Sequence, residues 1–536
     1  MKPMISHSQI SIQGDISLTC ELPQAFCNHE EKYILDLYSQ HQEDCVKNFY
    51  GDFSFLIHNQ KTNEYFGARD HLGIIPFFYS FQNGKVFYST KLKNLVKHPE
   101  FTAQINDNWV IRYLNGWEEE QHETAYENIF RLPPAHILTV NNGQLKISPY
   151  WEMTKPETID ISREEACRIF REKLTLAVKQ RLPKDGTPLA CELTGGVDSS
   201  SITAIASQIG APIQAFTHAA ESGDDERHLV NNFLKMHSKI SHQLITKKGA
   251  NVADDCRWVT KVLAQPPRAG VNEYARQLMQ AAGKTGAEII FSGFGGDEGV
   301  SQRATSCAHA EFIQNRQWAH LYREAKNYRP KLWPYTFCHI IYKYFFKSKP
   351  TFFDSSGDQE FLKPGFRLAP QKQGLGLPRK STYEYTKYLL PNRTHTAQRF
   401  EESYQLAAEF GLQYRYPLMD IHLIDFFNSL PTHCKIYLNQ NRYLFRNESM
   451  ADLTPASIRY NYDKGIGGSI IPGLQEIWDT LENERNKDFN FPFIDQDYLK
   501  KAREDDKLFI PAYSLIACEE LYKSSAKKNI TKRKDF

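Results

Sequence analysis

The sequence predicts a two-domain α/β protein, with a β-rich N-terminal domain and a C-terminal parallel sheet covered by helices. A length of 536 residues exceeds what one ordinary domain holds. Up to about residue 152, short runs that alternate between apolar and polar residues are separated by turn residues, which is typical of strands. From about residue 160, apolar runs alternate with helical patterns, which is typical of a parallel sheet.

We divide the chain into residues 1–152, residues 160–522 and a basic C-terminal tail over 523–536. Ser162 and Glu165 form a capping-box pattern, which predicts a helix that runs to about residue 181. The tail is expected to be a solvated end, with docking of an acidic partner as the alternative.

Within the second domain, residues 300–395 form an insert rich in aromatic and basic residues. Helical packing followed by a long loop is the simpler interpretation. The alternative is a lid or a substrate-binding insert, because long loops in compact enzymes are often functional.

Composition excludes several classes of protein. Hydrophobic residues make up 41% of the chain, and no apolar run approaches the roughly 18–20 residues that span a bilayer, so no membrane span is expected. No secretory signal pattern is visible at the N-terminus. Ten cysteines without a C-x-x-C pair fit the reduced thiols of a cytoplasmic protein, and a net charge of +2 does not indicate nucleic-acid binding.

A glycine-rich turn between a predicted strand (188–191) and a predicted helix (from 201) indicates phosphate binding. Glycines let the backbone approach an anion, and a helix N-terminus offers unpaired N–H groups. Asp198 would repel phosphate directly, so we expect it to hold Mg²⁺. The turn lacks the lysine of a P-loop. The residues of this predicted phosphate site are Leu193, Thr194, Gly195, Gly196, Asp198, Ser199 and Ser200.

A second glycine-rich loop, Ser292–Glu298, follows the predicted strand at 287–291. Ligands of open α/β sheets bind beyond the carboxyl ends of the strands, so the two loops should converge. Asp297 is then the expected second Mg²⁺ ligand, because Mg²⁺ is held by one or two carboxylates together with phosphate oxygens.

These loops carry a family resemblance. Leu-Thr-Gly-Gly-Val-Asp-Ser-Ser resembles the S-G-G-x-D-S-S loop of N-type ATP pyrophosphatases, with Thr194 in the first Ser position. Ser-Gly-Phe-Gly-Gly-Asp-Glu resembles the S-G-x-G-x-D-E signature of the asparagine synthetase family, and the run from Gly51 to Tyr79 is similar to that family's glutaminase-type domain.

The resemblance implies an Ntn-type αββα glutaminase-like domain followed by an adenine-nucleotide α-hydrolase-like sheet. It also implies an AMP-forming amide ligase that uses ATP and Mg²⁺. Backbone groups of Leu193, Phe216 and Thr217 would hold adenine, and Gly293 would contact ATP.

The glutaminase-like domain departs from the family pattern. A working glutaminase of this family needs Cys directly after the initiator Met, and this position is Lys2. Cys20 and Cys27 lie inside the chain and have no free amine beside them. We therefore expect a scaffold that does not hydrolyse glutamine, with a surface reshaped to hold a peptide as the alternative.

Motifs in the C-terminal third supply the remaining candidates. Arg459 and Lys464 match the family's R…K-x-G pattern, which implies that Lys464 neutralises charge on the breaking α-phosphate. A surface lysine is the alternative. Glu402, with Glu401 as the fallback, is the candidate base for the attacking amine, and a solvated helix-face carboxylate is the alternative.

The residue at position 294 distinguishes the amide-forming reactions known for this family. Asparagine synthetases carry Glu at this position and β-lactam synthetases carry Tyr, whereas Phe cannot exchange a proton. With the degenerate glutaminase domain, this most resembles the lasso-peptide macrolactam synthetases. That resemblance implies adenylation of an Asp or Glu side chain in a ribosomally made precursor peptide, ring closure by its N-terminal amine, and a leader peptidase as partner.

Two other functions remain open. One is a β-lactam-type or ammonia-dependent amide ligase that acts on a small acid. The other is a catalytically dead binding scaffold, which the presence of Asp198, Asp297 and Lys464 disfavours.

Overall fold

The computed structural model describes most of the chain. The described residues are 5–7, 10–19, 29–116, 122–183, 186–219, 226–246, 252–268, 273–301, 305–346, 353–354, 359–368, 372–373, 381–390, 394–438, 440–461, 491–498 and 509–531. Within these ranges no helix combines the length and the apolar character that crossing a bilayer requires.

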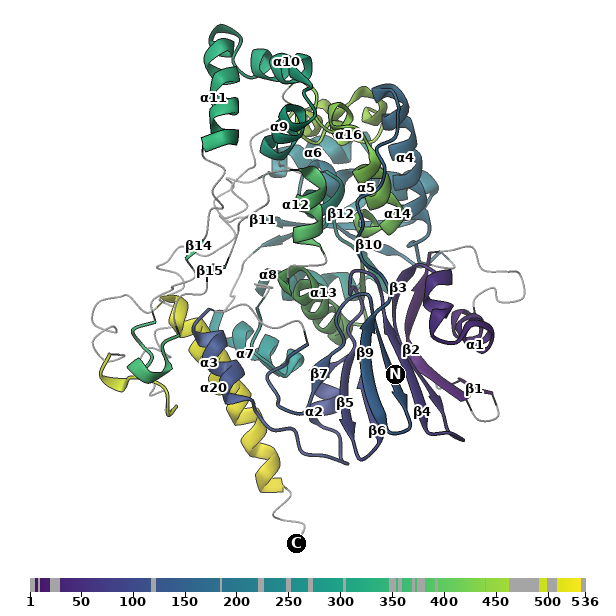
Figure 1. Ribbon diagram of the computed structural model, residues 1–536, viewed down its shortest axis with the longest axis vertical. Helices are drawn as coiled ribbons and strands as arrows, with labels where there is room; N and C mark the ends of the chain where they lie inside the picture. The colour runs from purple at the N-terminus through teal and green to yellow at the C-terminus, as the bar shows by residue number, and fades with distance from the viewer. Residues whose placement is uncertain are drawn as a thin grey trace.

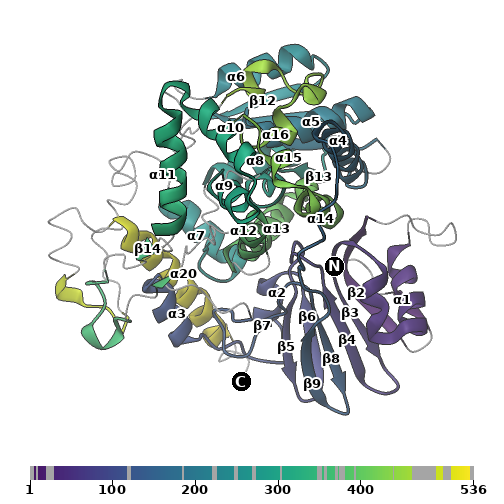
Figure 2. The ribbon, with the colours of Figure 1, turned by 45° about the horizontal axis from the view of Figure 1, so that its top comes forward.

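The N-terminal domain contains two antiparallel sheets, as Figures 1 and 2 show. The larger sheet has the order β1 (Ile5–His7), β2 (Ile10–Leu18), β3 (Gly51–Asn59), β4 (Glu64–Arg69), β8 (His136–Asn141), β9 (Gln144–Pro149). The smaller sheet has the order β6 (Lys85–Ser89), β5 (Phe78–Gln82), β7 (Phe130–Arg131). Strands β3 and β4 pair antiparallel, as expected for alternating runs separated by turn residues.

Apolar side chains cover both faces of the larger sheet, so the N-terminal domain is layered. Helix α1 (Glu30–His41) packs on one face through Ile34 and Leu37, against Phe53 and Phe55 of β3. On the other face, Leu56, Leu138 and Val140 of the larger sheet pack with Tyr79 and Val86 of the smaller one. Such alternation along a strand is what a sheet buried on both faces requires.

The C-terminal domain is built on a five-stranded parallel sheet, which confirms the predicted fold class. Its order is β12 (Ser241–Thr246), β11 (Ile213–Ala219), β10 (Leu189–Glu192), β13 (Ile289–Phe291), β16 (Gln413–Arg415). Successive strands are added on one side of β10 up to β12, and β13 then joins its other side. The strand order therefore reverses between β10 and β13, which is where open α/β sheets bind ligands.

Helices surround this sheet (Figure 1). They are α4 (Arg163–Lys179), α5 (Val197–Ile209), α6 (Arg227–Met236), α7 (Val252–Leu263), α8 (Glu273–Gly283), α13 (Thr394–Ala407), α14 (Ile421–Ser429), α15 (Thr432–Lys435), α16 (Tyr443–Arg446) and α17 (Ala456–Arg459). The predicted cap is confirmed, because the Ser162 hydroxyl accepts a hydrogen bond from the Glu165 N–H at 3.1 Å.

The insert is mainly helical where it is described. Its helices are α9 (Thr305–Gln314), α10 (Trp318–Tyr328), α11 (Trp333–Phe346) and α12 (Thr382–Leu389), and β14 (Phe353–Asp354) pairs with β15 (Lys372–Gln373). Helical packing, the simpler expectation, is confirmed for these residues. A role as a lid stays a prediction.

The two domains share a core and a buried ionic cluster. Helix α20 (Phe509–Thr531) extends through the predicted boundary at 522 and packs its Leu515–Leu521 segment against α3 (Asp107–Leu114) of the N-terminal domain. Elsewhere on the interface, Glu401 of α13 pairs with Arg69 at 3.0 Å and with Arg131 at 2.7 Å. All three side chains are at most 3% exposed, so the N-terminal domain is held tightly to the site-bearing domain.

Candidate active site

The turn after β10 forms a closed loop that leads into helix α5. The Thr194 N–H donates to the Ser199 hydroxyl at 3.2 Å, and the Gly196 N–H donates to the Thr194 hydroxyl at 3.4 Å. Gly195 has φ +75°, a left-handed conformation in which a side chain would be strained. The Thr194 hydroxyl therefore helps to close the loop, and its contact with ATP stays a prediction.

The first turn of α5 offers donors to an anion. Gly196 caps the helix without a side-chain hydrogen bond, so the N–H groups at its start receive no acceptor from that residue. The buried hydroxyls of Ser200 and Ser201 have no hydrogen-bond partner among the described residues. Unpaired donors at the N-terminus of a 13-residue helix are suited to phosphate.

The second loop lies directly on the first. A Cβ atom at Gly293 would meet the backbone nitrogen of Ser199 at 2.7 Å, and one at Gly296 would meet the Asp198 carboxyl carbon at 2.5 Å. At Gly293 the atom met is backbone, so a side chain there would push the loops apart, whereas at Gly296 it would displace the Asp198 carboxylate. The predicted convergence is thus observed, and it requires glycine at position 293.

Leu193, Phe216 and Thr217 lie side by side at the carboxyl ends of β10 and β11. The Leu193 N–H donates to the Phe216 carbonyl at 2.8 Å, and the Thr217 hydroxyl donates to the Leu193 carbonyl at 2.6 Å. His242 of β12 contacts the same hydroxyl at 2.9 Å, and its burial lowers the pKa of the imidazole. The geometry fits the expected adenine position, which stays a prediction.

Arg442 bridges the two carboxylates expected to bind magnesium. Its guanidinium lies 3.0 Å from Asp198 Oδ2 and also pairs with Asp297. The residue precedes α16 with φ +58°, a conformation that costs a non-glycine residue about 1–3 kcal/mol. Sequence reasoning missed Arg442, because neither a motif nor the spacing around it signals that it reaches these two loops.

The carboxylate pair fits a divalent cation. Asp198 Oδ1 is buried and has no hydrogen-bond partner within the described part of the chain, so it can still act as a ligand. Those residues include no group of three or more His, Cys, Asp or Glu placed for a metal. A cation between Asp198 and Asp297 would therefore complete its shell with phosphate oxygens and water, as Mg²⁺ commonly does.

Phe294 forms an apolar wall beside the second loop. Its ring packs edge-on against Phe400 at 5.6 Å and against Tyr416 at 6.2 Å, between ring centroids. The Arg399 guanidinium lies 4.4 Å from the centroid of the Phe294 ring. Burial raises the pKa of the Tyr416 phenol above its ordinary value, so this tyrosine is not poised as a base.

The two candidate bases on α13 lie in different surroundings. Glu401 is occupied by the arginines of the domain interface described above. Glu402 is 3% exposed, and its Oε1 accepts a hydrogen bond from the Arg268 N–H at 2.6 Å. The two glutamates therefore have different partners: Glu401 joins the domains through two arginines, whereas Glu402 accepts a backbone N–H. A catalytic role for Glu402 stays a prediction.

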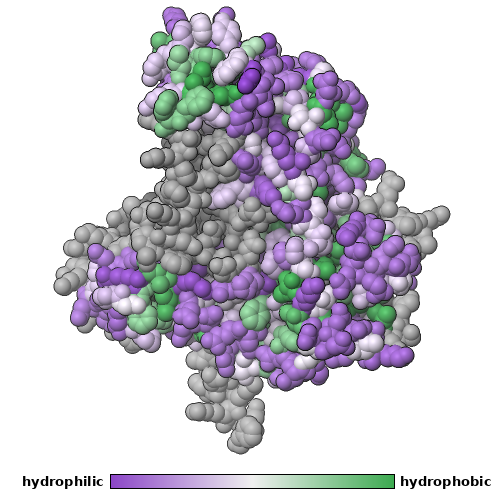
Figure 3. All heavy atoms as spheres, in the orientation of Figure 1, coloured by the Kyte–Doolittle hydropathy of each residue, from purple (hydrophilic) through white to green (hydrophobic). Residues whose placement is uncertain are grey.

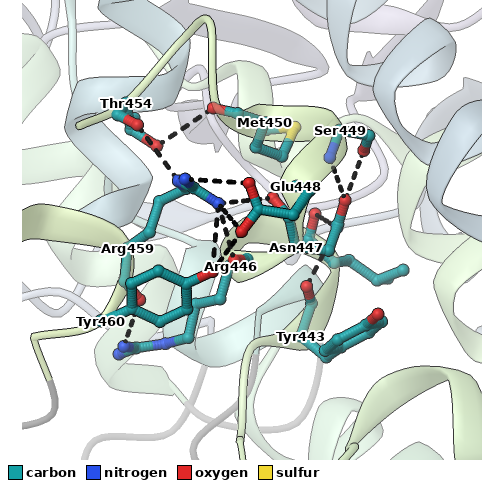
Figure 4. A network of polar contacts seen from close by, with 10 residues as sticks. Tyr443, Arg446, Asn447, Glu448, Ser449, Met450, Thr454, Arg459 and Tyr460 are labelled. Atoms are coloured by element: carbon teal, nitrogen blue, oxygen red, sulfur yellow. Dashed lines mark hydrogen bonds and ion pairs between the residues drawn. The ribbon is translucent and has the colours of Figure 1, made fainter. Parts of the chain in front are cut away.

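Arg459 belongs to a polar network rather than to the two loops (Figure 4). Its guanidinium donates to the carbonyls of Thr454 and Asn447, both at 3.2 Å, and pairs with Glu448 at 3.1 Å. Arg446 donates to the carbonyls of Arg459 and Asn461, so the segment that leads toward position 464 is anchored. Lys464 itself lies outside the described residues.

Two family models match the chain, one over each domain. The family model described as asparagine synthase matches residues 169–507, and the model described as glutamine amidotransferase domain matches residues 25–151. The first match covers more than half of the chain.

Three similar proteins each match part of the chain. Glutamine-hydrolyzing asparagine synthetase 3 of Bacillus subtilis (strain 168) is 30% identical over 201 residues, 36% of this chain and 32% of that protein. Amidase chry2 of Gibberella zeae is 27% identical over 188 residues, 34% and 27% of the two chains. Amidase chyE of Penicillium rubens is 24% identical over 289 residues, 49% and 42% of the two chains. The match thus spans less than half the length of each relative.

Proposed function

Because this chain belongs to the asparagine synthase family, we propose that it is an ATP-dependent, AMP-forming amide ligase, and specifically a lasso-peptide macrolactam synthetase. Its substrate would be a linear peptide that carries a free N-terminal amine and an internal Asp or Glu. The observation that carries the ligase activity is the contact between the loops of Asp198 and Asp297 at the switch point of the parallel sheet.

The described residues support adenylation. The N–H groups at the start of α5 would bind the triphosphate. Asp198 and Asp297 would hold Mg²⁺, which would neutralise charge on the phosphates as the bond to the α-phosphate breaks. When Mg²⁺ binds, the Arg442 side chain would move away from the two carboxylates. Its guanidinium would remain within reach of the triphosphate.

The reaction forms one amide and releases two products. An oxygen of the peptide's Asp or Glu carboxylate attacks the α-phosphorus of ATP, and pyrophosphate leaves. The N-terminal amine then attacks the activated carbonyl carbon, the bond to AMP breaks, and the amine's proton passes to Glu402. The peptide loses one water in total. Holding the peptide folded brings amine and carbonyl together, which replaces a bimolecular encounter.

Two features support ring closure over use of free ammonia. Phe294 supplies no acid or base where the resemblance expects Glu in asparagine synthetases, and it lies in an aromatic wall suited to a peptide. In the described N-terminal domain the cysteine is Cys45, whose burial raises the pKa of its thiol to about 12, so it is no nucleophile. The amine would then come from the peptide, and a leader peptidase in the cytoplasm would free it.

An amide ligase that acts on a small acid is the second candidate. The asparagine synthetase name of the Bacillus relative favours it. The two candidates differ in what they activate, because a small-acid ligase responds to free amino acids and a macrolactam synthetase does not.

ATP–pyrophosphate exchange with Mg²⁺ tests the proposal. We would offer free Asp, free Glu, ammonium and linear peptides that have a free N-terminus and an internal acid. Exchange with peptide alone, followed by a product lighter by one water, supports the macrolactam synthetase. Exchange with free Asp or Glu overturns it in favour of the small-acid ligase.

Matched variants separate the site from the fold. Asp198→Asn and Asp297→Asn should each lower exchange by about a hundredfold or more, because a bound metal contributes several kcal/mol. Asp254→Asn is the control, since that carboxylate is 68% exposed and pairs with Arg257 of the same helix. Normal exchange in both site variants would remove adenylation from the proposal.

A further inference from the structure

The hairpin of α10 and α11, residues 318–346, exposes an unusual amount of apolar surface. Phe346 is 72% exposed and Tyr335 is 64% exposed. The same stretch holds eight of the 13 large hydrophobic side chains found exposed in the described chain. These eight are Trp318, Tyr322, Tyr328, Leu332, Tyr335, Tyr342, Phe345 and Phe346.

Helix α11 is apolar on two faces. Its inner face packs Phe337, Ile340, Ile341 and Tyr344 against a core that includes Phe312 of α9 and Leu321 of α10. Its outer face carries aromatic residues at positions 335, 342, 345 and 346. A helix that is apolar all round is normally covered on every side, so the outer face is expected to have its own apolar partner.

The surface around these aromatic residues is strongly cationic. All the lysines and arginines between 315 and 346 are exposed, and they are Arg316, Arg323, Lys326, Arg329, Lys331 and Lys343. The single carboxylate in that range, Glu324, is 3% exposed and accepts a hydrogen bond from the Leu438 N–H at 3.0 Å. Six cations therefore face solvent without an exposed acid among them, on a chain whose net charge is +2.

The hairpin is a ridge rather than a groove. Figures 1 and 2 both show α11 at the margin of the molecule, and Figure 3 shows hydrophobic and hydrophilic spheres interleaved on this end of one face. Lys326 lies 5.8 Å from the ring centroid of Tyr322, and the Arg329 guanidinium lies 5.4 Å from that of Tyr328. Long basic side chains beside Trp, Tyr and Phe are typical of surfaces that enter a lipid headgroup layer.

We propose that this hairpin docks the protein on an anionic lipid surface. Aromatic side chains on the outer face of α11 would enter the boundary between headgroups and acyl chains, while exposed lysines and arginines of the hairpin contact anionic headgroups. At 14 residues α11 is shorter than the roughly 20 that span a bilayer, so the helix would lie on the surface. A convex cationic ridge fits a lipid surface better than a peptide or a single-stranded nucleic acid, which are bound in grooves.

Flotation of the full-length protein with vesicles tests the inference. One set of vesicles contains phosphatidylcholine alone, and the other contains it with an equal amount of phosphatidylglycerol. We expect binding to the anionic set, weakened by added salt. The double variant Phe345→Ser/Phe346→Ser should lower the partition coefficient at least about tenfold. Lys331→Gln/Lys343→Gln should lower it about thirtyfold, on anionic vesicles alone.

Leu176→Ser is the matched control, because Leu176 is 52% exposed on α4, outside the hairpin. Its partition coefficient should equal that of the parent protein, and near-UV circular dichroism should show all variants folded. Equal binding to both vesicle sets overturns the inference, as does flotation that neither hairpin variant alters. Capture of single-stranded RNA or of an acidic peptide in place of vesicles also overturns it. The assay needs neither ATP nor substrate, so its outcome is independent of the proposed ligase activity.

Discussion

Arg442 lies 3.0 Å from Asp198 and pairs at the same time with Asp297, so one guanidinium contacts both carboxylates expected to bind magnesium and offsets one of their two negative charges. The arginine side chain is 6% exposed, and Asp198 is 15% exposed. A cation that binds between the two acids must therefore displace a side chain that already compensates their charge.

Replacing Arg442 with Met should strengthen Mg²⁺ binding in the absence of nucleotide. Two unpaired carboxylates attract a dication more strongly, and a charge pair near the surface is worth a few kcal/mol, so we expect tighter binding by about tenfold or more. Isothermal titration with MgCl₂ measures this. ATP–pyrophosphate exchange should fall in the same variant, because a cation near the phosphates is lost. An unchanged magnesium affinity would show that Arg442 does not compete with the metal.

Glu402→Gln should slow ring closure and leave adenylation intact. The amide can still accept the hydrogen bond from the Arg268 N–H, but it cannot take a proton from the amine. Loss of a general base costs about 10²–10⁴ in rate. Quench-flow detection of the macrolactam, alongside pyrophosphate exchange, separates the two steps. Glu409→Gln, on a partly exposed residue beyond α13, is the control, and equal ring closure in both variants would dismiss Glu402 as the base.

Glu401→Ala should loosen the domain interface. It would leave Arg69 and Arg131 buried without their carboxylate, and breaking such a pair costs about 3–5 kcal/mol. We expect a lower melting temperature and faster cleavage between the domains in limited proteolysis. Arg168→Ala removes two exposed ion pairs on α4, with Glu165 and Glu172, and should change stability by less than about 1 kcal/mol. A melting temperature that is equal in the two variants would contradict the role given to Glu401.

The buried Lys435 should make the free energy of unfolding depend on pH in the alkaline range. Burial lowers the pKa of its ammonium to about 8, below its ordinary value of 10.5. Between these values the unfolded chain binds a proton that the folded chain does not, so this residue's contribution to stability rises with pH across that window. The penalty is complete below about pH 8 and absent above about pH 10.5.

Lys435→Met should therefore melt at a higher temperature than the parent protein near neutral pH. The gain should be at least about 2–4 °C, the shift expected for 1 kcal/mol in a domain of this size. Glu311 keeps hydrogen bonds from Thr382 and Thr432 in the variant, so it is not left unsatisfied. Differential scanning fluorimetry across pH should show the gap closing as pH rises. A variant that melts lower near neutral pH would show that the attraction to Glu311 outweighs the cost of burial.

Local patterns were enough to determine much of this protein. The capping residue at Ser162, the strand–turn–helix around Thr194 and the hairpin after Gly51 all follow from contacts between residues near one another in sequence. Convergence of the loops of Asp198 and Asp297 could also be predicted, because parallel strands bring their carboxyl ends to one edge of a sheet.

Long-range packing decided what those patterns could not. Adjacent glutamates on α13 read alike in sequence, yet Glu401 binds two arginines of the other domain and Glu402 accepts a backbone N–H from Arg268. Arg442 reaches Asp198 across 244 positions of sequence, and it does so from a left-handed backbone that no motif announces. Periodicity reports only the face that a residue occupies on its own element, whereas the partner on that face depends on how distant elements pack. The sequence by itself therefore determined the family, the sheet and its two glycine-rich loops, and the tertiary structure decided which charges meet there.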